Sequence, residues 1–210
     1  MRGIAFIGGE SPGPQVLKEI ARGADLLVAA DSGLIICEGA GLTPDWILGD
    51  MDSLDLARLD KYPPERVLRY PADKDFTDTE LALIHLREKG CDEVWIAGGG
   101  GGSRLDHVFA IRSLFEREDG PDKWFPGKDE ICCVREGTVL SAELAPGSLV
   151  SVFPLRSCLG EEGWEAESSG LKWPLKGLAW KAGSFGVSNV AMEGPVEIRS
   201  VRGRFMVFLG

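Results

Sequence analysis

Acidic side chains recur directly after short apolar runs, where they could hold a metal ion. Asp50 and Asp52 stand two apart behind the run at 46–48, and in an extended segment such residues point the same way. Asp75 and Asp78 stand at the mouth of a helix expected at 78–89. So many carboxylates repel one another unless a cation lies among them, and Mg²⁺ prefers carboxylates together with water and substrate phosphates. We therefore predict a magnesium site at Asp50, Asp52 and Asp78.

A simpler interpretation of the same residues stays open. The pattern Asp-x-Asp-Ser is also typical of turns and caps. Thr77 and Glu80 have the spacing of a capping box at the start of the helix. That interpretation accounts for Thr77 and Glu80 but leaves the neighbouring carboxylates unexplained.

Glycines and two cations are placed to meet phosphate oxygens. A run of five glycines at 98–102 follows a strand expected at 94–97 and precedes a helix expected at 105–117. Glycine lets backbone N–H groups approach a phosphate closely, and a helix N-terminus favours negative charge; a flexible connector is the alternative. Lys74 and Arg104 would supply the positive charge. The run is not a Walker A loop, and no G-x-G-x-x-G follows the first strand, which disfavours a nicotinamide-dependent oxidoreductase.

The elements that must position these residues alternate along the first two-thirds of the chain. We expect strands at 4–7, 25–30, 46–48, 67–70 and 94–97, and helices at 15–22, 33–40, 78–89 and 105–117. This order predicts an α/β, Rossmann-like fold with a mostly parallel sheet, whose ligands bind beyond the carboxyl ends of the strands. The residues that we expect to meet nucleotide or phosphate at this edge are Gly8, Gly9, Ser32, Gly33, Lys74, Asp75, Gly99, Gly101, Gly102 and Arg104.

The helical pattern disappears after about residue 120. Short alternating segments separated by Gly or Pro predict strands at 131–134, 139–144, 149–153, 178–181, 196–201 and 204–209. We therefore expect two domains, a catalytic nucleotide-binding α/β domain at 1–145 and a small all-β sandwich at 146–210.

Composition excludes several classes of partner. Asp and Glu number 33 against 23 Lys and Arg, for a net charge of −10, whereas nucleic acids and anionic membranes require a basic surface. No stretch approaches the roughly 20 apolar residues that span a bilayer, and the first apolar run is too short for a signal peptide. The five cysteines are scattered without a C-x-x-C pair, which predicts reduced thiols rather than a zinc site or disulfides. We expect a cytoplasmic protein.

Several ordered motifs together resemble the thiamine pyrophosphokinase (thiamine diphosphokinase) family. They are Asp31-Ser32-Gly33, Pro44-Asp45 with Gly49-Asp50-Met51-Asp52-Ser53, Lys74-Asp75-Phe76-Thr77-Asp78, Arg104-Leu105-Asp106-His107, and Gly170-Leu171-Lys172-Trp173-Pro174-Leu175 followed by Ser188-Asn189. The resemblance spans nearly the whole chain. It implies a catalytic α/β domain with a β-sandwich domain, and a homodimer with active sites between its subunits. It also implies transfer of a diphosphate from Mg-ATP to the thiamine hydroxyl, with release of AMP.

The resemblance also implies roles for individual residues. It places magnesium on Asp50, Asp52 and Asp78, and nucleotide or phosphate contacts near Asp31, Lys74, Thr77, Arg104 and Asp106. It implies that Trp173 stacks on thiamine, with Ser188 and Asn189 near the pyrimidine ring; an aromatic face can attract a cation. Where the family usually has Gly-Gly-Arg, this chain has Gly102-Ser103-Arg104, which leaves the nucleotide preference open.

The predicted reaction is attack of the thiamine hydroxyl on the β-phosphorus of ATP. Such transfers depend chiefly on positioning and charge stabilisation, for which metal-binding carboxylates, a cation and backbone N–H groups suffice. The predicted catalytic residues are Asp50, Asp52, Asp78 and Asp106, with Asp78 or Asp106 as proton acceptor. Two alternatives remain: another magnesium–nucleotide-dependent kinase of a small molecule, which would release ADP, and a nucleotide-binding sensor without chemistry.

Overall fold

The computed structural model describes residues 1–101, 104–156, 163–181 and 183–210. Contacts divide the chain into two compact units: Met1–Leu114 with Asp119–Lys128, and Phe115–Glu118 with Asp129–Gly210. The boundary therefore falls at 128/129 rather than at the expected 145/146. The reason is strand pairing, because the strands at 130–134 and 139–142 pair with the C-terminal strands.

The first unit is built on a parallel sheet. Its strand order is β6-β5-β1-β2-β3-β4, and each pairing among its described residues is parallel. The strands are β1 Arg2–Ile7, β2 Leu26–Ala30, β3 Trp46–Gly49, β4 Val67–Arg69, β5 Glu93–Gly98 and β6 Lys123–Phe125. This confirms the expected α/β layer with a parallel sheet in the first part of the chain.

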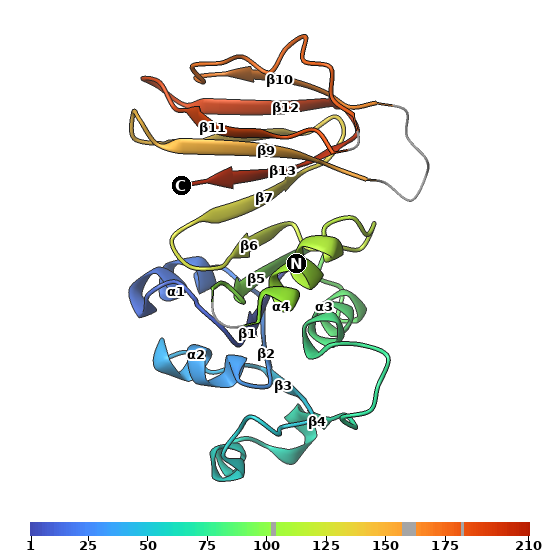
Figure 1. The fold of residues 1–210 in the computed structure, drawn as a ribbon. Helices are drawn as coiled ribbons and strands as arrows, with labels where there is room; N and C mark the ends of the chain where they lie inside the picture. The colour runs from blue at the N-terminus through green and yellow to red at the C-terminus, as the bar shows by residue number, and fades with distance from the viewer. Residues whose placement is uncertain (102–103, 157–162, 182) are drawn as a thin grey trace. The chain divides into compact units, whose positions relative to one another are not determined.

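Helices cover both faces of this sheet (Figure 1). They are α1 Pro14–Ala21, α2 Gly33–Gly39, α3 Asp78–Glu88 and α4 Leu105–Leu114. Leu17 of α1 and Cys37 of α2 pack with Ile4 and Phe6 of β1, whereas Leu86 of α3 approaches Gly3 on the other face of β1.

One glycine determines where α2 can begin. A Cβ on Gly33 would collide with the carbonyl group of Phe6 in β1. Only glycine therefore allows the first turn of α2 to lie directly against the central strand.

The order of the strands fixes where a ligand could bind. The chain moves from β1 through β2, β3 and β4 on one side, and then places β5 and β6 on the other side of β1. The direction of the connections thus reverses between β1 and β5. In open α/β sheets the crevice at the carboxyl ends of the strands at such a point is the usual binding site.

The second unit consists of two antiparallel groups of strands. One has the order β11-β9-β13-β7 and the other β10-β12-β8. The strands are β7 Glu130–Val134, β8 Val139–Ala142, β9 Leu149–Leu155, β10 Glu165–Ser169, β11 Gly186–Val190, β12 Val196–Arg202 and β13 Arg204–Leu209. Val152 of β9, Phe205 of β13 and Ile198 of β12 belong to one hydrophobic cluster, so both groups share a core.

One prediction for this unit is wrong, and two of its strands were missed. The segment expected as a strand at 178–181 forms only an isolated bridge, between Trp180 and Trp164. The strands β10 and β11 were not predicted, because β10 is mostly polar and β11 does not alternate cleanly in burial. Among the described residues no helix is long and apolar enough to cross a membrane.

Candidate active site

The acidic segment after β3 is a turn built around a buried methionine. Met51 adopts a left-handed backbone, with φ of 65°, and its side chain is 3% exposed within a cluster with Leu34 and Ile47. The Asp52 N–H donates to Asp50 Oδ1 at 3.2 Å. The sequence predicted an extended segment here, but the segment forms a turn. Burial of Met51 instead anchors the turn and leaves the carboxylates on either side of it available.

A third carboxylate from the neighbouring strand joins this turn. Asp31 follows β2 with φ of 44°, and its N–H donates to Leu48 O at 2.9 Å. One carboxylate oxygen each from Asp31, Asp50 and Asp52 lie within 4.8 Å of one another. Asp31 Oδ1 is buried and has no hydrogen-bond partner among the described residues. A buried anionic oxygen without a donor is costly, so this cluster has the chemistry of a site for a hard divalent cation.

Asp78 lies beside the same cluster but contacts a lysine. Lys74 Nζ is 3.2 Å from Asp78 Oδ1 and 3.5 Å from Asp50 Oδ2, and the Lys74 side chain is 13% exposed. A Cβ on Gly49 would lie 3.2 Å from Asp31 Cβ and 3.3 Å from Asp78 Cγ, so these two residues flank the end of β3. Of the three predicted metal ligands, Asp50 and Asp52 thus share a cluster with Asp31, and Asp78 is linked to that cluster through Lys74.

The electrostatics of the cluster follow from this crowding. Burial raises the pKa of Asp78, the charges of Asp50 and Asp31 add to the rise, and Lys74 opposes it. A backbone hydrogen bond from Asp52 lowers the pKa of Asp50, with Lys74 contributing. Burial lowers the pKa of Lys74, but its hydrogen bonds and attraction to Asp78 and Asp50 outweigh this and raise it. Lys74 is therefore held in its charged form.

The start of α3 has the expected capping box. The Glu80 N–H donates to Thr77 Oγ1 at 3.2 Å, and the Thr77 N–H donates to Glu80 Oε2 at 2.9 Å. This fixes the first turn of α3 and with it Asp78, the first residue of the helix. Asp75 is exposed in the preceding loop. The predicted phosphate contacts of Thr77 and Asp75 stay predictions.

The glycine segments after β1 and β5 are joined through their backbones. Gly99 N–H donates to Gly8 O at 3.1 Å, and Glu10 and Gly100 form an antiparallel bridge with N···O distances of 2.7 and 2.9 Å. A Cβ on Gly100 would collide with Pro126 O, so glycine is required for this close approach. These segments lie at the β1–β5 reversal, where a phosphate is expected; Gly102 lies outside the described residues.

Glu10 is a neighbour of these glycines that the sequence prediction left out. Its carboxylate lies against Gly101 and Gly127. Ser32, at the start of α2, places its hydroxyl beside Gly8. Gly9 approaches the backbone of Gly99, so the two loops form one surface with few side chains.

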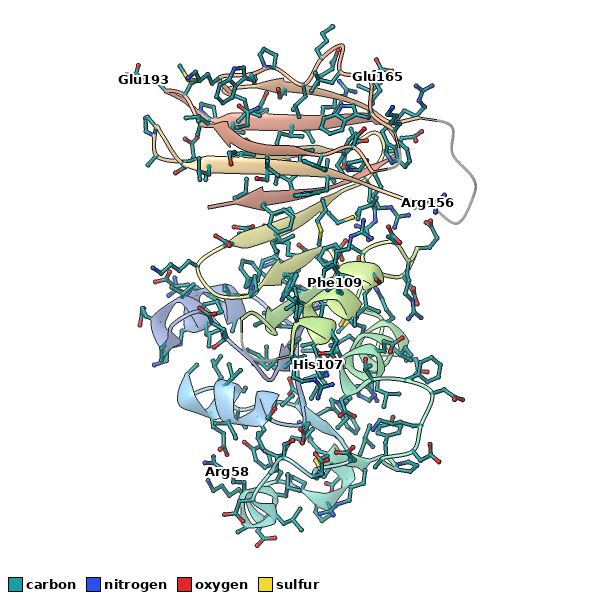
Figure 2. The ribbon with its side chains drawn as sticks, viewed as in Figure 1. Arg58, His107, Phe109, Arg156, Glu165 and Glu193 are labelled. Atoms are coloured by element: carbon teal, nitrogen blue, oxygen red, sulfur yellow. The ribbon has the colours of Figure 1, made fainter. Side chains whose placement is uncertain are left out.

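Arg104 and Asp106 form an exposed pair at the start of α4. Arg104 Nε is 3.0 Å from Asp106 Oδ1 and its Nη2 is 2.9 Å from Oδ2, with both side chains more than 60% exposed. The hydrogen bonds from Arg104 lower the pKa of Asp106 to about 2. The next turn of this helix carries exposed His107 and Phe109, which Figure 2 labels.

The predicted thiamine-binding residues lie together in the second unit. Trp173 is 53% exposed, with Lys172 Nζ 4.6 Å from the centroid of its ring. Asn189 is buried and hydrogen-bonded to the backbone of Trp173. Ser188 is exposed and has a left-handed backbone, with φ of 57°.

The part of the chain that carries the carboxylate cluster is similar in sequence to known proteins. The family model for the catalytic domain of thiamin pyrophosphokinase matches residues 17–120, which include the whole carboxylate cluster and Lys74. The thiamine pyrophosphokinase of Bacillus subtilis (strain 168) is 38% identical over 95 residues, which cover 43% of this chain and 44% of that protein. Over residues 17–120 the chain is therefore similar to the thiamine pyrophosphokinase family.

Solved structures of the thiamine pyrophosphokinase family share the fold over the whole chain. The Bacillus subtilis enzyme superposes with a TM-score of 0.80 at 23% identity, covering 99% of this chain and 98% of that one. A thiamin pyrophosphokinase from Candida albicans gives 0.70 at 16% identity, covering 99% and 89%. The sequence match to the curated Bacillus subtilis relative covers less than half of that relative's length.

Proposed function

We propose that the chain is a thiamine pyrophosphokinase, which transfers a diphosphate from ATP to the hydroxyl of thiamine and releases AMP. The observation that carries the proposal is the carboxylate cluster of Asp31, Asp50 and Asp52, with Lys74 and Asp78 beside it, within the segment that the family model matches. The exposed Trp173 in the second unit supports thiamine as the acceptor.

Magnesium fits the cluster because its donors are carboxylate oxygens and one of them, Asp31 Oδ1, is buried without a donor. Asp31, Asp50 and Asp52 would hold the ion, with Asp78 as the further predicted ligand. When bound, the ion would neutralise charge on the phosphate oxygens. The protein's own side chains and backbone would supply the other contributions to the reaction.

Lys74 and the backbone would position the diphosphate. Lys74 is kept protonated between two carboxylates and can donate to a phosphate oxygen while it stays near Asp78. Gly99 and Gly100 already donate their N–H groups to Gly8 O and Glu10 O, so Gly101 and the segment 8–9 would supply backbone N–H groups, with the exposed Arg104 as a second cation. The thiamine hydroxyl would attack the β-phosphorus in line with the departing AMP. Asp78 or Asp106 would accept the proton of the hydroxyl.

The second unit would bind thiamine through Trp173 and Ser188, with Asn189 adjacent to both. We further propose that the first unit is Rossmann-like and the second a β-sandwich, because residues of both antiparallel groups share one core. We also propose a cytoplasmic homodimer with active sites between its subunits. The apolar side chains of Leu105 and Phe109, one turn apart on α4 and each 64% exposed, support such an interface.

The decisive experiment incubates the purified protein with ATP, MgCl₂ and thiamine and quantifies thiamine diphosphate, AMP and ADP. Thiamine diphosphate and AMP in equal amounts are expected, and Asp52→Asn should reduce turnover by orders of magnitude while circular dichroism stays unchanged. Formation of ADP instead would identify a kinase that transfers one phosphate. Nucleotide binding without any product would identify a sensor.

A further inference from the structure

The segment that carries Trp173 runs alongside β11 and its continuation. Met192 N–H donates to Gly170 O at 2.8 Å, Lys172 N–H donates to Val190 O at 2.9 Å, and Leu171 and Ala191 form an antiparallel bridge. These contacts form a short ladder that advances toward Trp173. Continued in this register, the ladder would place Trp173 opposite Asn189 and Pro174, which has no N–H to donate, opposite Ser188.

On its other side β11 has a bulge at this point, where it pairs with β9. The register of β11 with β9 shifts between Gly186 and Asn189, so that Gly186 pairs with Val152 and Asn189 with Val150. One residue more lies on β11 than on β9 between these pairs. Ser188 adopts a left-handed backbone there, and its N–H donates to Ser151 Oγ at 3.2 Å.

The side chain of Asn189 binds both backbone groups of Trp173. Its Oδ1 accepts from the Trp173 N–H at 3.1 Å and from the Val190 N–H at 2.9 Å, while its Nδ2 donates to Trp173 O at 2.6 Å. Asn189 is 8% exposed. Both lone pairs of its carbonyl oxygen and one of its two N–H groups are therefore used within the protein.

The residue held in this way contributes little to the core. Trp173 is 53% exposed, whereas Trp164 and Trp180 are 8% and 7% exposed and belong to the hydrophobic cluster. Pro174 follows Trp173 and restricts its backbone to extended conformations. The backbone of Trp173 is thus fixed from two sides while its indole faces outward, an arrangement that preorganises the ring for a ligand.

We infer that Asn189 is a positioning residue, which holds the backbone of Trp173 so that the indole presents its face to the cationic ring system of thiamine. The inference rests on the proposed function. It differs from a direct contact between Asn189 and the pyrimidine ring in one measurable respect. A residue that acts only through Trp173 has no further effect once the indole is removed.

The first test is a double-mutant cycle on the KM for thiamine. Asn189→Ala should raise this KM about tenfold, with kcat changed less than threefold and the KM for ATP unchanged. Trp173→Ala should raise it at least as much, and the double variant should match Trp173→Ala alone. Ser168→Ala is the matched control, since it removes the hydrogen bond to Leu175 N, two residues beyond Trp173, and should leave the KM for thiamine within twofold. Should Asn189→Ala fail to fold, Asn189→Asp keeps the acceptor oxygen but cannot donate to Trp173 O, and the same increase is expected.

The second test needs no turnover. In protein labelled with 5-fluorotryptophan, Trp173→Phe assigns the ¹⁹F resonance of Trp173, and Asn189→Ala should shift or broaden that line while the lines of Trp164 and Trp180 stay in place. The inference would be overturned if Asn189→Ala left the KM for thiamine within twofold of wild type. It would also be overturned if the effects of the two single substitutions multiplied in the double variant, or if Asn189→Ala left the Trp173 resonance unmoved. If the wild-type protein makes no thiamine diphosphate, the proposed function fails, and the ¹⁹F spectra still decide whether Asn189 positions Trp173.

Discussion

The substitution Asp31→Asn separates a metal-binding carboxylate from an ordinary polar contact. The asparagine keeps the shape of the side chain and tolerates the left-handed backbone at this position. It removes one negative charge from a group whose oxygens lie within 4.8 Å of one another. The substitution should therefore stabilise the protein without metal and reduce the additional stabilisation by Mg²⁺.

The magnitude follows from the spacing of the charges. Two unit charges 4.8 Å apart repel by about 3.5 kcal/mol at an effective dielectric constant of about 20. Because Asp52 is exposed and solvent screens the pairs, we expect a net gain of about 1 kcal/mol in the free energy of unfolding without metal. For a chain of this size that corresponds to a rise in Tm of about 2–4 °C.

The same substitution should weaken the binding of Mg²⁺. If the ion loses one of its carboxylate ligands, its Kd should rise at least tenfold, which removes about 1.4 kcal/mol of the stabilisation at saturating metal. Thermal melts with and without 10 mM MgCl₂ measure both effects, and Asp60→Asn, an exposed aspartate outside the cluster, is the control. A lower Tm of the metal-free Asp31→Asn protein, or an undiminished shift with Mg²⁺, would refute the reasoning.

Three further predictions concern the scaffold. Gly33→Ala should cost about 1–3 kcal/mol in urea unfolding, because its methyl group meets the backbone of β1, whereas Gly39→Ala in the same helix, with open space around it, should cost less than 1 kcal/mol. Burial lowers the pKa of His85 below 6.5, so the unfolded chain takes up the proton first as the pH falls. The contribution of His85 to the free energy of unfolding should therefore be fully present above pH 6.5 and decrease toward pH 5. Urea midpoints measured at each pH should fall more steeply in wild type than in His85→Gln. Arg204→Met should cost about 2 kcal/mol, because the buried guanidinium donates to Arg117 O and Glu118 Oε1; calorimetry that finds no loss would contradict this role.

The sequence predicted the first unit well because its signals are local. Each buried parallel strand is a short apolar run, and the capping box at Thr77 marks the first turn of α3 within the chain itself. The parallel arrangement then dictates that segments following different strands meet at one edge. For this reason Asp50, Asp52 and Asp78 could be predicted as neighbours without coordinates.

The remaining features depend on backbone conformation, which residue types do not reveal. Asp31 reaches the carboxylate cluster because its backbone is left-handed, and the left-handed Met51 makes a turn of a segment whose sequence predicts an extended conformation. In the second unit, the left-handed Ser188 breaks the alternation of β11, so neither the strand nor the contact from Asn189 to Trp173 could be predicted. The side chains at these positions are compatible with several conformations, and only the surrounding packing selects one.

The burial of Met51 has a consequence for how the protein loses activity on heating. Asp50 and Asp52 flank a side chain that packs with Leu34 of α2 and Ile47 of β3, so the turn has no freedom to open while that cluster stays intact. Many enzymes lose activity well before they unfold, because their catalytic loops melt first. Here the proposed metal ligands belong to the same cooperative unit as the core, so the temperature at which Mg²⁺ binding is lost should coincide with the temperature at which the first unit unfolds.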